Sequence, residues 1–460
     1  MYRFYLNNVD NDYHYAEMCR VFLDDSEFET ICIELGEDSN IALGANSYLL
    51  NKDGLGRRDV IKRELYNLLK DITGMQPEWG TMTGVRPLKL ALDKYQEAGC
   101  IEVLNECLSD LYLMSINKIR LLDELIEYQS KYVDLPDSSK SSLYIGIPFC
   151  PTRCAYCSFA SNVAPKEVIQ EYFDNLIKEI QYAGSLAIKH GSELESIYIG
   201  GGTPTTLNEY QLAELIDEVA HSFGIEPSNI EFTIEAGRPD TITEAKLKAI
   251  RDKGISRISI NPQTMKDATL RLIGRNHTSD EIVKAYELAA KYGFDIINAD
   301  LIAGLPEENI DDFKRSLDRV IELGANNITI HTLSVKRGSR LKDDNPEYYR
   351  QGAETVKEML QYAHAQLLEQ GFYPYYMYKQ KHQIGAFENV GYCKADKHSL
   401  YNIRIMEEKQ TIIALGAGGI GKVYYPDEDR LERIPNVSNY EVYNQRFDEM
   451  LERKNLYYGG

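Results

Sequence analysis

The sequence lacks any apolar run of the roughly 18 residues that a membrane-spanning helix needs. Its first residues, MYRFYLNNVDND, have neither the basic start nor the apolar stretch of a secretory signal. We therefore expect a cytoplasmic protein without a membrane span. Hydrophobic residues make up 43% of the chain and charged residues 27%, which is typical of a soluble globular protein.

Basic residues are under-represented. The 460 residues include 51 lysines and arginines against 71 acidic residues, a formal net charge of −20. An acidic surface repels phosphate backbones, so we expect no nucleic-acid partner, and tRNA modification is disfavoured. A local basic pocket can still bind an anionic substrate. The length itself predicts two or three domains.

Cysteine is scarce, with eight residues in the whole chain. A reducing cytosol disfavours disulfides, so a tight group of cysteines there indicates a metal or catalytic site. Three of the eight lie within eight residues, at Cys150, Cys154 and Cys157. The other five are scattered and are interpreted as small buried side chains.

The middle of the chain alternates between β-branched, strand-like runs and amphipathic, helix-like stretches. In 209–222, apolar residues recur at the three- and four-residue spacing of a helix face. Strand and helix alternating every roughly 30–40 residues indicate successive βαβ units and a parallel sheet. Six such units predict an α/β fold with a partial (βα)6 barrel. The expected strands are 143–147, 196–199, 230–234, 257–260, 296–302 and 327–330.

The regions on either side of this core have different patterns. Residues 1–140 combine two short strand-like runs with helical stretches and end in a polar segment, which predicts an N-terminal α+β domain and a linker. Residues 141–370 form the expected barrel core. Residues 371–460 lose the alternation of strand and helix, and we expect them to form a C-terminal α+β domain that covers the barrel mouth and the substrate.

Several expected strands end in residues that are unusual for a plain turn. The second strand runs into Gly200–Pro204, the third into Glu235 and the fourth into 261–263, while Asp300 lies in the fifth. In parallel α/β barrels the carboxyl ends of the strands carry the chemistry. We therefore expect these residues to meet at one mouth of the barrel.

The three grouped cysteines have the spacing C-x3-C-x2-C, directly after the first expected strand. Thiolates are the usual ligands of iron–sulfur clusters, and three of them can bind three of the four irons of a 4Fe–4S cluster. The fourth iron is then open to a chelating ligand. A structural zinc site is the alternative, but it needs four protein ligands, and Cys393 could supply the fourth only through folding.

This motif at the end of the first strand resembles the radical S-adenosylmethionine superfamily. The resemblance implies that Cys150, Cys154 and Cys157 are the catalytic metal ligands of a 4Fe–4S cluster whose open iron is chelated by S-adenosylmethionine. One electron from the cluster then gives methionine and a 5′-deoxyadenosyl radical. The cofactor supplies the difficult chemistry, and the protein supplies position and exclusion of water. The resemblance also implies an electron donor of the flavodoxin or ferredoxin class.

The glycine-rich turn 200–204 resembles the segment of this superfamily that binds the methionine end of the cofactor. Gly201, Gly202 and Thr203 are the predicted contacts, because glycine lets the backbone approach a ligand and exposed amides bind a carboxylate. A plain tight turn is the alternative. Glu235 is predicted to accept the ribose hydroxyls, with a solvated acid at a strand end as the alternative.

The run from Gln263 through Arg275 to the sequence DLIAGLP at 300–306 is similar to the oxygen-independent coproporphyrinogen III oxidase family. The resemblance implies that Gln263, Arg275 and Asp300 lie around the cofactors. In that family these include S-adenosylmethionine at the cluster and a second molecule of it, and the sequence leaves open whether both bind here. Structural ion pairs or positions on a helix surface are the alternative roles.

Further stretches resemble the HemZ-type branch of that family, coproporphyrinogen dehydrogenase. The implied reaction belongs to haem and porphyrin biosynthesis: two propionates of coproporphyrinogen III become the vinyl groups of protoporphyrinogen IX, with loss of CO2. A haem chaperone of the same family and a radical methyltransferase acting on a tetrapyrrole are the alternatives. The polar set Gln263, Arg275 and Asp300 favours nucleotide cofactors over haem storage. The matching stretches are 79–89, 144–150, 388–392 and 415–422.

Two positions depart from the better-known branch of the family. Gly146 stands where that branch has a histidine and Phe159 where it has a fourth cysteine, so the roles of those side chains do not transfer. Tyr144 and Tyr156 are candidate contacts of the first cofactor, with plain core packing as the alternative.

The implied tetrapyrrole substrate carries four carboxylates and needs cations. Arg86 and Lys89, in the stretch GVRPLK, are the candidate substrate-binding residues, since guanidinium groups bind carboxylates in a bidentate way. Surface charges at a helix start are the alternative interpretation of both.

Overall fold

The computed structural model describes residues 1–35, 43–51, 58–157, 162–334 and 352–458. It contains two compact units: Met1–Glu127 with Met377–Glu388, and Tyr128–Tyr376 with Asn389–Gly460. Residues 377–388 lie in the region expected to form a C-terminal domain, but they group with the first unit. The domain boundaries near 140 and 370 stay a prediction. Among the described residues, no helix is both long and apolar enough to cross a lipid bilayer.

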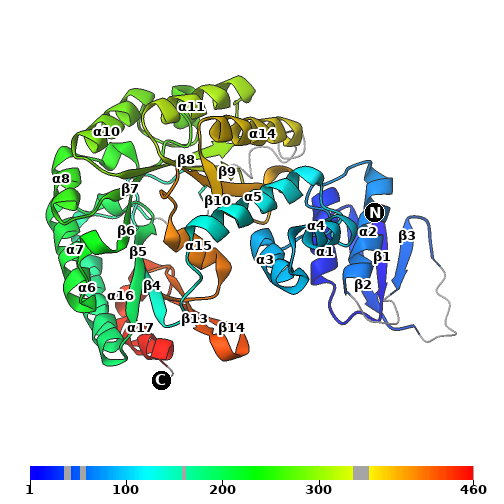
Figure 1. Ribbon diagram of the computed structural model, residues 1–460, viewed down its shortest axis with the longest axis horizontal. Helices are drawn as coiled ribbons and strands as arrows, with labels where there is room; N and C mark the ends of the chain where they lie inside the picture. The colour runs from blue at the N-terminus through cyan, green and yellow to red at the C-terminus, as the bar shows by residue number, and fades with distance from the viewer. Residues whose placement is uncertain (36–42, 52–57, 158–161, 335–351, 459–460) are drawn as a thin grey trace. The chain divides into compact units, whose positions relative to one another are not determined.

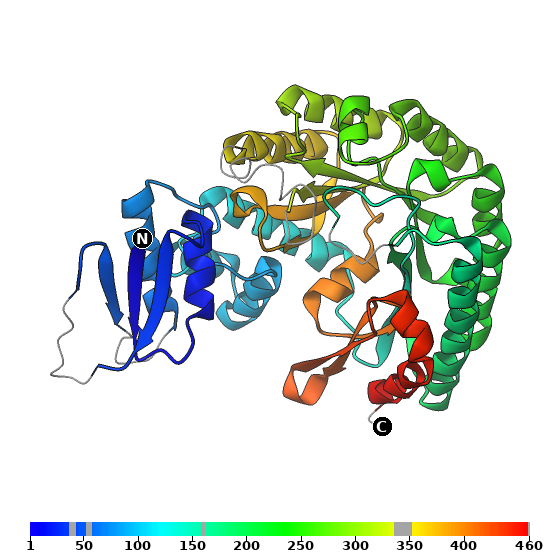
Figure 2. The same cartoon turned by 180° about the vertical axis from the view of Figure 1, so that it is seen from behind.

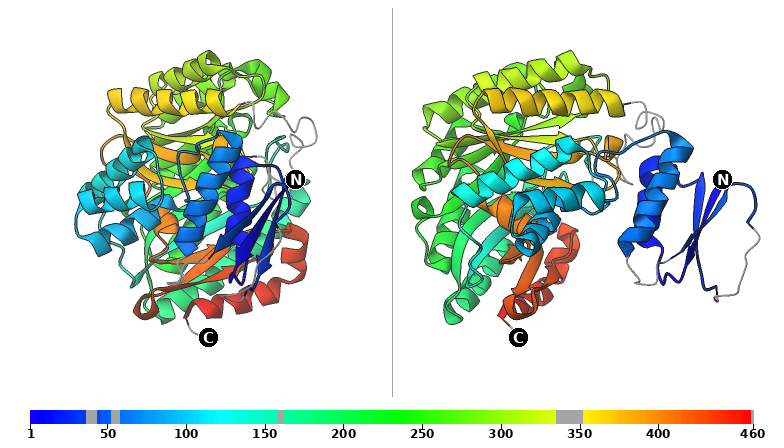
Figure 3. Two further views of the ribbon diagram at one scale, coloured as in Figure 1. Left: turned by 90° about the vertical axis from the view of Figure 1, so that its right-hand side faces the viewer. Right: turned by 45° about the vertical axis from the view of Figure 1, so that its right-hand side comes forward.

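The first unit contains a small parallel sheet with the strand order β2-β1-β3 and helices α1 and α2 against one face (Figure 3). Phe4 and Leu6 of the central strand are fully buried with Leu65 and Leu69 of α2. This apolar layer holds the helices on the sheet. The elements are β1 (Tyr2–Asn7), α1 (Tyr13–Phe22), β2 (Phe28–Ile33), β3 (Ser47–Asn51), α2 (Arg58–Thr73), α3 (Pro87–Ala98), α4 (Ile101–Asp110) and α5 (Ile116–Tyr132), the last continuing into the second unit.

In the second unit, the described residues form an 11-stranded sheet with the order β10-β11-β9-β8-β7-β6-β5-β4-β12-β13-β14. Strands β4 to β9 are parallel, and helices cover the outer face of the curved sheet (Figures 1 and 2). The α/β fold with a parallel barrel-like sheet is therefore confirmed. The parallel strands are β4 (Lys140–Ile147), β5 (Glu193–Gly201), β6 (Glu231–Gly237), β7 (Arg257–Ile260), β8 (Ile296–Ala303) and β9 (Asn327–Thr332).

Local sequence explains these elements. The strand β7 has all four residues buried, as expected for a strand covered on both faces. The outer helix α11 begins with a capping box between Asn309 and Asp312 and buries Phe313, Leu317 and Val320 along one side. The outer helices are α6 (Lys166–Lys189), α7 (Glu209–Phe223), α8 (Glu244–Asp252), α9 (Asp267–Leu272), α10 (Ser279–Lys291), α11 (Ile310–Glu322) and α14 (Ala353–Glu369).

Strands from the C-terminal region extend this sheet at both ends. β11 pairs antiparallel with β9, and β12 pairs parallel with β4. An open barrel leaves unpaired backbone groups along its two edge strands, and the added strands satisfy them. The elements are β10 (Tyr373–Lys379), β11 (Glu388–Cys393), α15 (Leu400–Glu407), β12 (Thr411–Leu415), β13 (Ile420–Tyr425), β14 (Arg430–Pro435), α16 (Tyr440–Gln445) and α17 (Phe447–Glu452).

Residues 397–410, here called the closing segment, cross the amino ends of the parallel strands. Glu231 at the start of β6 accepts hydrogen bonds from the amides of Leu400 and Tyr401, at 2.7 and 2.9 Å. Arg404 of α15 is fully buried and binds Glu195 of β5 through two bonds of 3.0 Å. Helix α15 thereby lies inside the curve of the sheet (Figure 1). The carboxyl ends of the strands are at the opposite end, where the candidate residues lie.

Candidate functional site

The cysteine loop leaves the carboxyl end of β4 and is fixed at several points. The amide of Cys150 donates to Asn162 O, and the amide of Asn162 donates back to Pro148 O, both at 2.9 Å. Farther along, the amide of Ala155 donates to Ile273 O at 2.9 Å. The three cysteine side chains are partly buried. Phe159, which follows them, lies outside the described residues.

The glycine turn after β5 packs directly on this loop. The amides of Gly202 and Thr203 donate to Ile147 O and Phe149 O at 2.8 and 2.7 Å. A Cβ atom at Gly202 would lie 2.5 Å from Phe149 O, so only glycine permits this approach. The sequence predicted exposed amides here, but these two are paired within the protein. In this structure the turn positions the cysteine loop, and its glycines serve a close contact between two backbones.

Glu235 ends up beside the same turn, at the carboxyl end of β6. It accepts a hydrogen bond from the hydroxyl of Tyr198 on β5. Burial raises the pKa of Glu235 from 4.5 to about 7, and the charge of Asp300 adds to this, while hydrogen bonds from Tyr198 and the amide of Gly201 oppose it. Glu235 is therefore an acid that exchanges its proton near neutral pH.

Tyr144 belongs to a stack of three tyrosines inside the barrel. Its ring lies 6.4 Å from that of Tyr198 and 6.2 Å from that of Tyr401 on α15, with the planes within 21° of parallel. Burial raises the pKa of the Tyr144 hydroxyl above its usual value, and the Glu235 charge adds to the shift. The stack joins β4, β5 and the closing segment beneath Glu235. Tyr198 and Tyr401 were not predicted from sequence, because a tyrosine in a strand or helix is usually core.

Gly146, the position where a histidine was absent, packs against the turn after β12. A Cβ atom at residue 146 would lie 2.9 Å from Ala417 O, and one at Gly416 would lie 2.4 Å from Gly146 O. The hydroxyl of Tyr172 donates to Gly146 O at 2.6 Å. A larger side chain therefore has no room at residue 146 in this fold.

Gln263 and Asp300 meet through their backbones across the ends of β7 and β8. The amide of Gln263 donates to Asp300 O at 2.8 Å, and Gln263 has a positive φ of 68°. A non-glycine residue in this region is strained, which is common at functional sites. The Asp300 carboxylate accepts from Asn298 at 2.9 Å and lies 3.6 Å from His331 Nε2. The Asp300 carboxylate is also close enough to Glu235 for its charge to act on that carboxyl.

Arg275 is buried between the cysteine loop and β7. Its Nη1 donates to Asn261 O at 2.5 Å, and its Nη2 lies 3.4 Å from the hydroxyl of Tyr156, between the second and third cysteines. Its Nε is buried and has no hydrogen-bond partner among the residues that the structure describes. A buried guanidinium with an unsatisfied donor is costly unless an anion binds it. Arg275 therefore fits a carboxylate ligand at this point.

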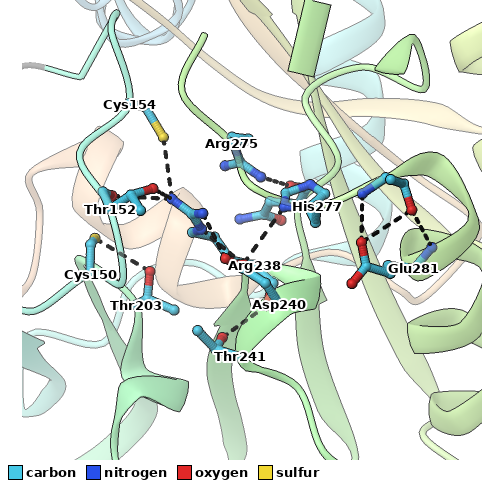
Figure 4. Close-up of polar contacts among 12 residues, drawn as sticks. Cys150, Thr152, Cys154, Thr203, Arg238, Asp240, Thr241, Arg275, His277 and Glu281 are labelled. Carbon is cyan, nitrogen blue, oxygen red and sulfur yellow. Dashed lines mark hydrogen bonds and ion pairs between the residues drawn. The ribbon is translucent and has the colours of Figure 1, made fainter. Parts of the chain in front are cut away.

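Three further residues near the loop were missed by the sequence reasoning. Arg238 follows β6, binds Asp240 with two bonds and reaches the loop at Thr152 and Cys154 (Figure 4). His277 lies 3.7 Å from Asp240. Burial opposes ionisation of Asp240, but His277 and Arg238 together lower its pKa well below the usual value. The signal in the sequence was a charged pair two residues apart, directly after a strand.

Arg86 and Lys89 lie in the first unit, at the start of α3. Arg86 is the residue before the helix, and Lys89 forms an ion pair of 3.2 Å with Asp93 one turn along. A partly exposed ion pair one helical turn apart contributes little to stability. Both residues stay predictions as substrate contacts.

The donor set of the loop fits an iron–sulfur cluster bound by Cys150, Cys154 and Cys157. Three thiols lie in one fixed loop, and Arg238 Nη1 approaches the sulfur of Cys154 to 3.9 Å. In the part of the chain that the structure describes, no three histidine, cysteine or carboxylate side chains gather around one point as ligands of a single ion do. Each cluster ligand binds a different iron, so that finding concerns single-ion sites alone.

Comparison with known proteins identifies the family of this chain. The radical SAM superfamily model matches residues 144–320. The chain is 39% identical to "oxygen-independent coproporphyrinogen-III oxidase-like protein HemZ" of Bacillus subtilis, over 87% of this chain and 81% of that protein. It is 30% identical to "Heme chaperone HemW" of the same organism, over 61% of this chain and 71% of that protein.

Among solved structures, coproporphyrinogen III oxidase (HemN) from Escherichia coli matches 73% of each chain with a TM-score of 0.54 and 23% identity. That likeness shows a shared fold. Membership of the radical SAM superfamily implies a 4Fe–4S cluster and S-adenosylmethionine as cofactors. Because the 39% identity to HemZ extends over most of both chains, the protein belongs to the radical SAM superfamily and, within it, to the HemZ-type branch of the oxygen-independent coproporphyrinogen III oxidase family.

Proposed function

We propose that the protein converts coproporphyrinogen III to protoporphyrinogen IX without oxygen, by oxidative decarboxylation of two propionates. One observation carries the proposal: Arg275 contacts Tyr156 and Cys154 of the cysteine loop. At the same carboxyl ends of the strands, Asp300 of β8 lies close enough to Glu235 of β6 for its charge to act on that carboxyl. A cluster, a nucleotide cofactor and its carboxylate each have suitable groups there. The 39% identity to the oxygen-independent coproporphyrinogen-III oxidase-like protein HemZ supports the choice of substrate.

In this proposal Cys150, Cys154 and Cys157 hold the 4Fe–4S cluster. When bound together, the cluster and S-adenosylmethionine supply one-electron reductive cleavage and hydrogen-atom abstraction. The cysteine loop and glycine turn hold the thiols in place through backbone hydrogen bonds. Arg275 offers its unsatisfied Nε to the cofactor carboxylate, because a guanidinium binds a carboxylate strongly and in a fixed geometry.

The other predicted contacts divide between the ribose and the barrel interior. Ionised Glu235 accepts the ribose hydroxyls, while Tyr198 keeps its carboxylate oriented. Gln263 pairs through its backbone with the part of β8 that holds Asp300, and both are proposed to contact the cofactors. The closing segment blocks the amino ends of the strands, which keeps water from entering there. A second S-adenosylmethionine would share this interior.

The reaction that these groups must support balances as follows. Each propionate loses a hydrogen atom from its β-carbon, CO2 from its carboxylate, and one electron to an external acceptor, which leaves a vinyl group. The reductant that charges the cluster is a flavodoxin- or ferredoxin-class donor in this proposal. Arg86 and Lys89 are the proposed cations for the substrate carboxylates.

The test is an anaerobic assay of the protein reconstituted with iron and sulfide, given dithionite, S-adenosylmethionine and coproporphyrinogen III. We expect 5′-deoxyadenosine and the divinyl product by mass spectrometry. Cys154→Ala should abolish both, whereas Cys32→Ala, at an exposed position, should keep both. Formation of 5′-deoxyadenosine without a divinyl product would refute the proposed substrate but would still support S-adenosylmethionine as the cofactor.

A haem chaperone is the second candidate, favoured by the 30% identity to HemW. A chaperone would bind haem stoichiometrically and give no divinyl product. Titration with haem, followed by its Soret absorption, distinguishes the two. Tight haem binding together with failure of the decarboxylation assay would favour the chaperone.

A further inference from the structure

Arg238 is a buried cation in which each of the three guanidinium nitrogens has a hydrogen-bond partner. Its side chain is 3% exposed, and its Nε and Nη2 bind the two carboxylate oxygens of Asp240 at 3.0 and 2.7 Å. The remaining nitrogen, Nη1, points at the cysteine loop (Figure 4). There it donates to Thr152 Oγ1 at 2.7 Å and Thr152 O at 3.1 Å, and lies 3.9 Å from Cys154 Sγ.

The backbone around Arg238 fixes this direction. Gly237, just before it, has a positive φ of 64° and accepts the amide of Asn261 at 2.8 Å. The hydroxyl of Thr241 donates back to Arg238 O at 2.8 Å. The turn is closed on both sides, so the guanidinium is held in place before any ligand binds.

A purely structural ion pair would not need the contacts to the loop. Arg238 and Asp240 already satisfy each other through two parallel bonds, which is the strongest arrangement for this pair. The bonds to Thr152 and Cys154 join residues 84 to 86 positions apart in the chain. They place a positive charge beside one cysteine sulfur, where a lysine could not also span Asp240 and Thr152.

We propose that Arg238 and Asp240 are positioning residues that set the reduction potential of the cluster through Cys154. This rests on the cluster site of the proposed function and on no assumption about its substrate. Hydrogen bonds and charge near the sulfurs tune the potential of iron–sulfur clusters. The Arg238 cation stabilises the more negative, reduced cluster, and Asp240 limits that effect by neutralising part of the charge.

Substitutions of Arg238 and Asp240 should shift the reduction potential of the cluster in opposite directions. Arg238→Gln removes the cation and should make the potential more negative. Asp240→Asn leaves the cation without its counter-charge and should make the potential less negative. General loosening of the loop would not move the two variants in opposite directions, so the sign separates an electrostatic role from a structural one.

The experiment is a redox titration of the anaerobically reconstituted protein without substrate, followed by EPR of the reduced cluster. For Arg238→Gln we expect about a tenfold smaller equilibrium constant for one-electron reduction, a shift of ~59 mV. Arg319→Gln, which removes an exposed arginine paired with Glu322 on α11, should leave the potential unchanged. Iron content is measured on every variant.

Unchanged potentials in Arg238→Gln and Asp240→Asn at full iron content would overturn the proposal, and so would shifts of the same sign. If Arg238→Gln takes up no cluster, Asp240→Asn decides alone, and the absence of an upward shift overturns the proposal. If the wild-type protein takes up no cluster, both this proposal and the proposed cysteine site are refuted. Unshifted potentials in the variants would refute only the role of Arg238 and Asp240.

Discussion

Cys150 Sγ lies 3.4 Å from Thr203 Oγ1, so the first cysteine of the loop contacts the turn that follows the neighbouring strand. The same turn donates its Gly202 and Thr203 amides to Ile147 and Phe149. The cysteine loop and the glycine turn are therefore one structural element. Substitutions in the glycine turn after β5 should therefore affect how the cysteine loop after β4 binds the cluster.

Gly202→Ala should destabilise this element. The new Cβ would lie 2.5 Å from Phe149 O and 3.0 Å from Ile147 O, and both are backbone atoms that cannot move aside alone. We expect a loss of roughly 1–3 kcal/mol in the free energy of unfolding and a reduced iron content after reconstitution. Urea denaturation and iron analysis measure the two. Gly44→Ala is the control, because its nearest neighbour is 3.8 Å away; equal losses in both variants would contradict the argument.

Thr203→Val should make the cysteine loop bind the cluster less tightly, while the side chain keeps its shape. It removes the hydroxyl beside Cys150 and leaves the amide bond to Phe149 in place. A hydrogen bond worth about 1 kcal/mol corresponds to about fivefold faster release of iron to a chelator. Thr73→Val, whose hydroxyl binds Leu69 O in the first unit, should release iron at the wild-type rate. Identical rates in all three proteins would show that the Thr203 hydroxyl is irrelevant.

Glu235 should make the stability of the cofactor-free protein depend on pH. Burial raises its pKa from 4.5 to about 7, so the folded state binds the proton more tightly than the unfolded chain. The stabilisation is complete below the unfolded value and is lost as pH rises through the folded value. Glu235→Gln cannot ionise, yet its amide oxygen can still accept from Tyr198. Its stability relative to wild type should rise between about pH 5 and about pH 8.

Urea denaturation at a series of pH values checks this expectation. Glu214→Gln, on the exposed side of α7, is the matched control and should give a difference that is flat across the range. A flat difference for Glu235→Gln would mean that the carboxyl ionises normally in the folded protein.

The first unit has its own sensitive point at Glu388. This buried carboxylate binds Lys118 at 2.5 Å and accepts the indole N–H of Trp79 at 2.7 Å. Burial favours the neutral acid, but the pairing with Lys118 outweighs it and lowers the pKa of Glu388. Glu388→Gln leaves Lys118 with Glu78 as its one remaining carboxylate among the described residues.

Breaking a buried pair from one side costs about 3–5 kcal/mol, so we expect a loss of that order in the free energy of unfolding of Glu388→Gln. Glu102→Gln, at an exposed position in the first turn of α4, should change the stability by less than about 0.5 kcal/mol. Guanidinium denaturation measures both. A small effect at Glu388 would mean that the pair is solvated in the native state.

The sequence predicted the parallel sheet and its strand-end residues well, because both depend on short patterns. The alternation of apolar runs gives β4 to β9, and Cys150, Glu235 and Asp300 follow from their places at strand ends. The contribution of the C-terminal region was less predictable. Pairing of β12 with β4 joins segments about 270 residues apart, and no local pattern encodes it.

The same holds for residues that act through distant partners. Arg238 stands in an ordinary turn, and its importance comes from Thr152, which lies 86 positions earlier. Tyr401 is one of 33 tyrosines in the chain, and its position against Tyr198 depends on the closing segment. From sequence, Gly146 is only a position that lacks the histidine of the better-known branch. The structure shows that Ala417 O lies too close to leave room for a larger side chain there. Such residues can be recognised only once the fold shows which distant residues lie beside them.

The parallel pairing of β12 with β4 also sets an order of events during synthesis. Strand β4, which leads into the cysteine loop, has β5 on one side early, but its other neighbour ends at Leu415. At about 5–20 residues per second, the ribosome reaches that point on the order of 15–50 s after β4 is made. For that time, nascent chains therefore carry the cysteine loop next to a strand that has one unpaired edge. Iron delivery is expected to follow release of the finished chain, and truncation before β12 should leave the thiols intact but the cluster unloaded.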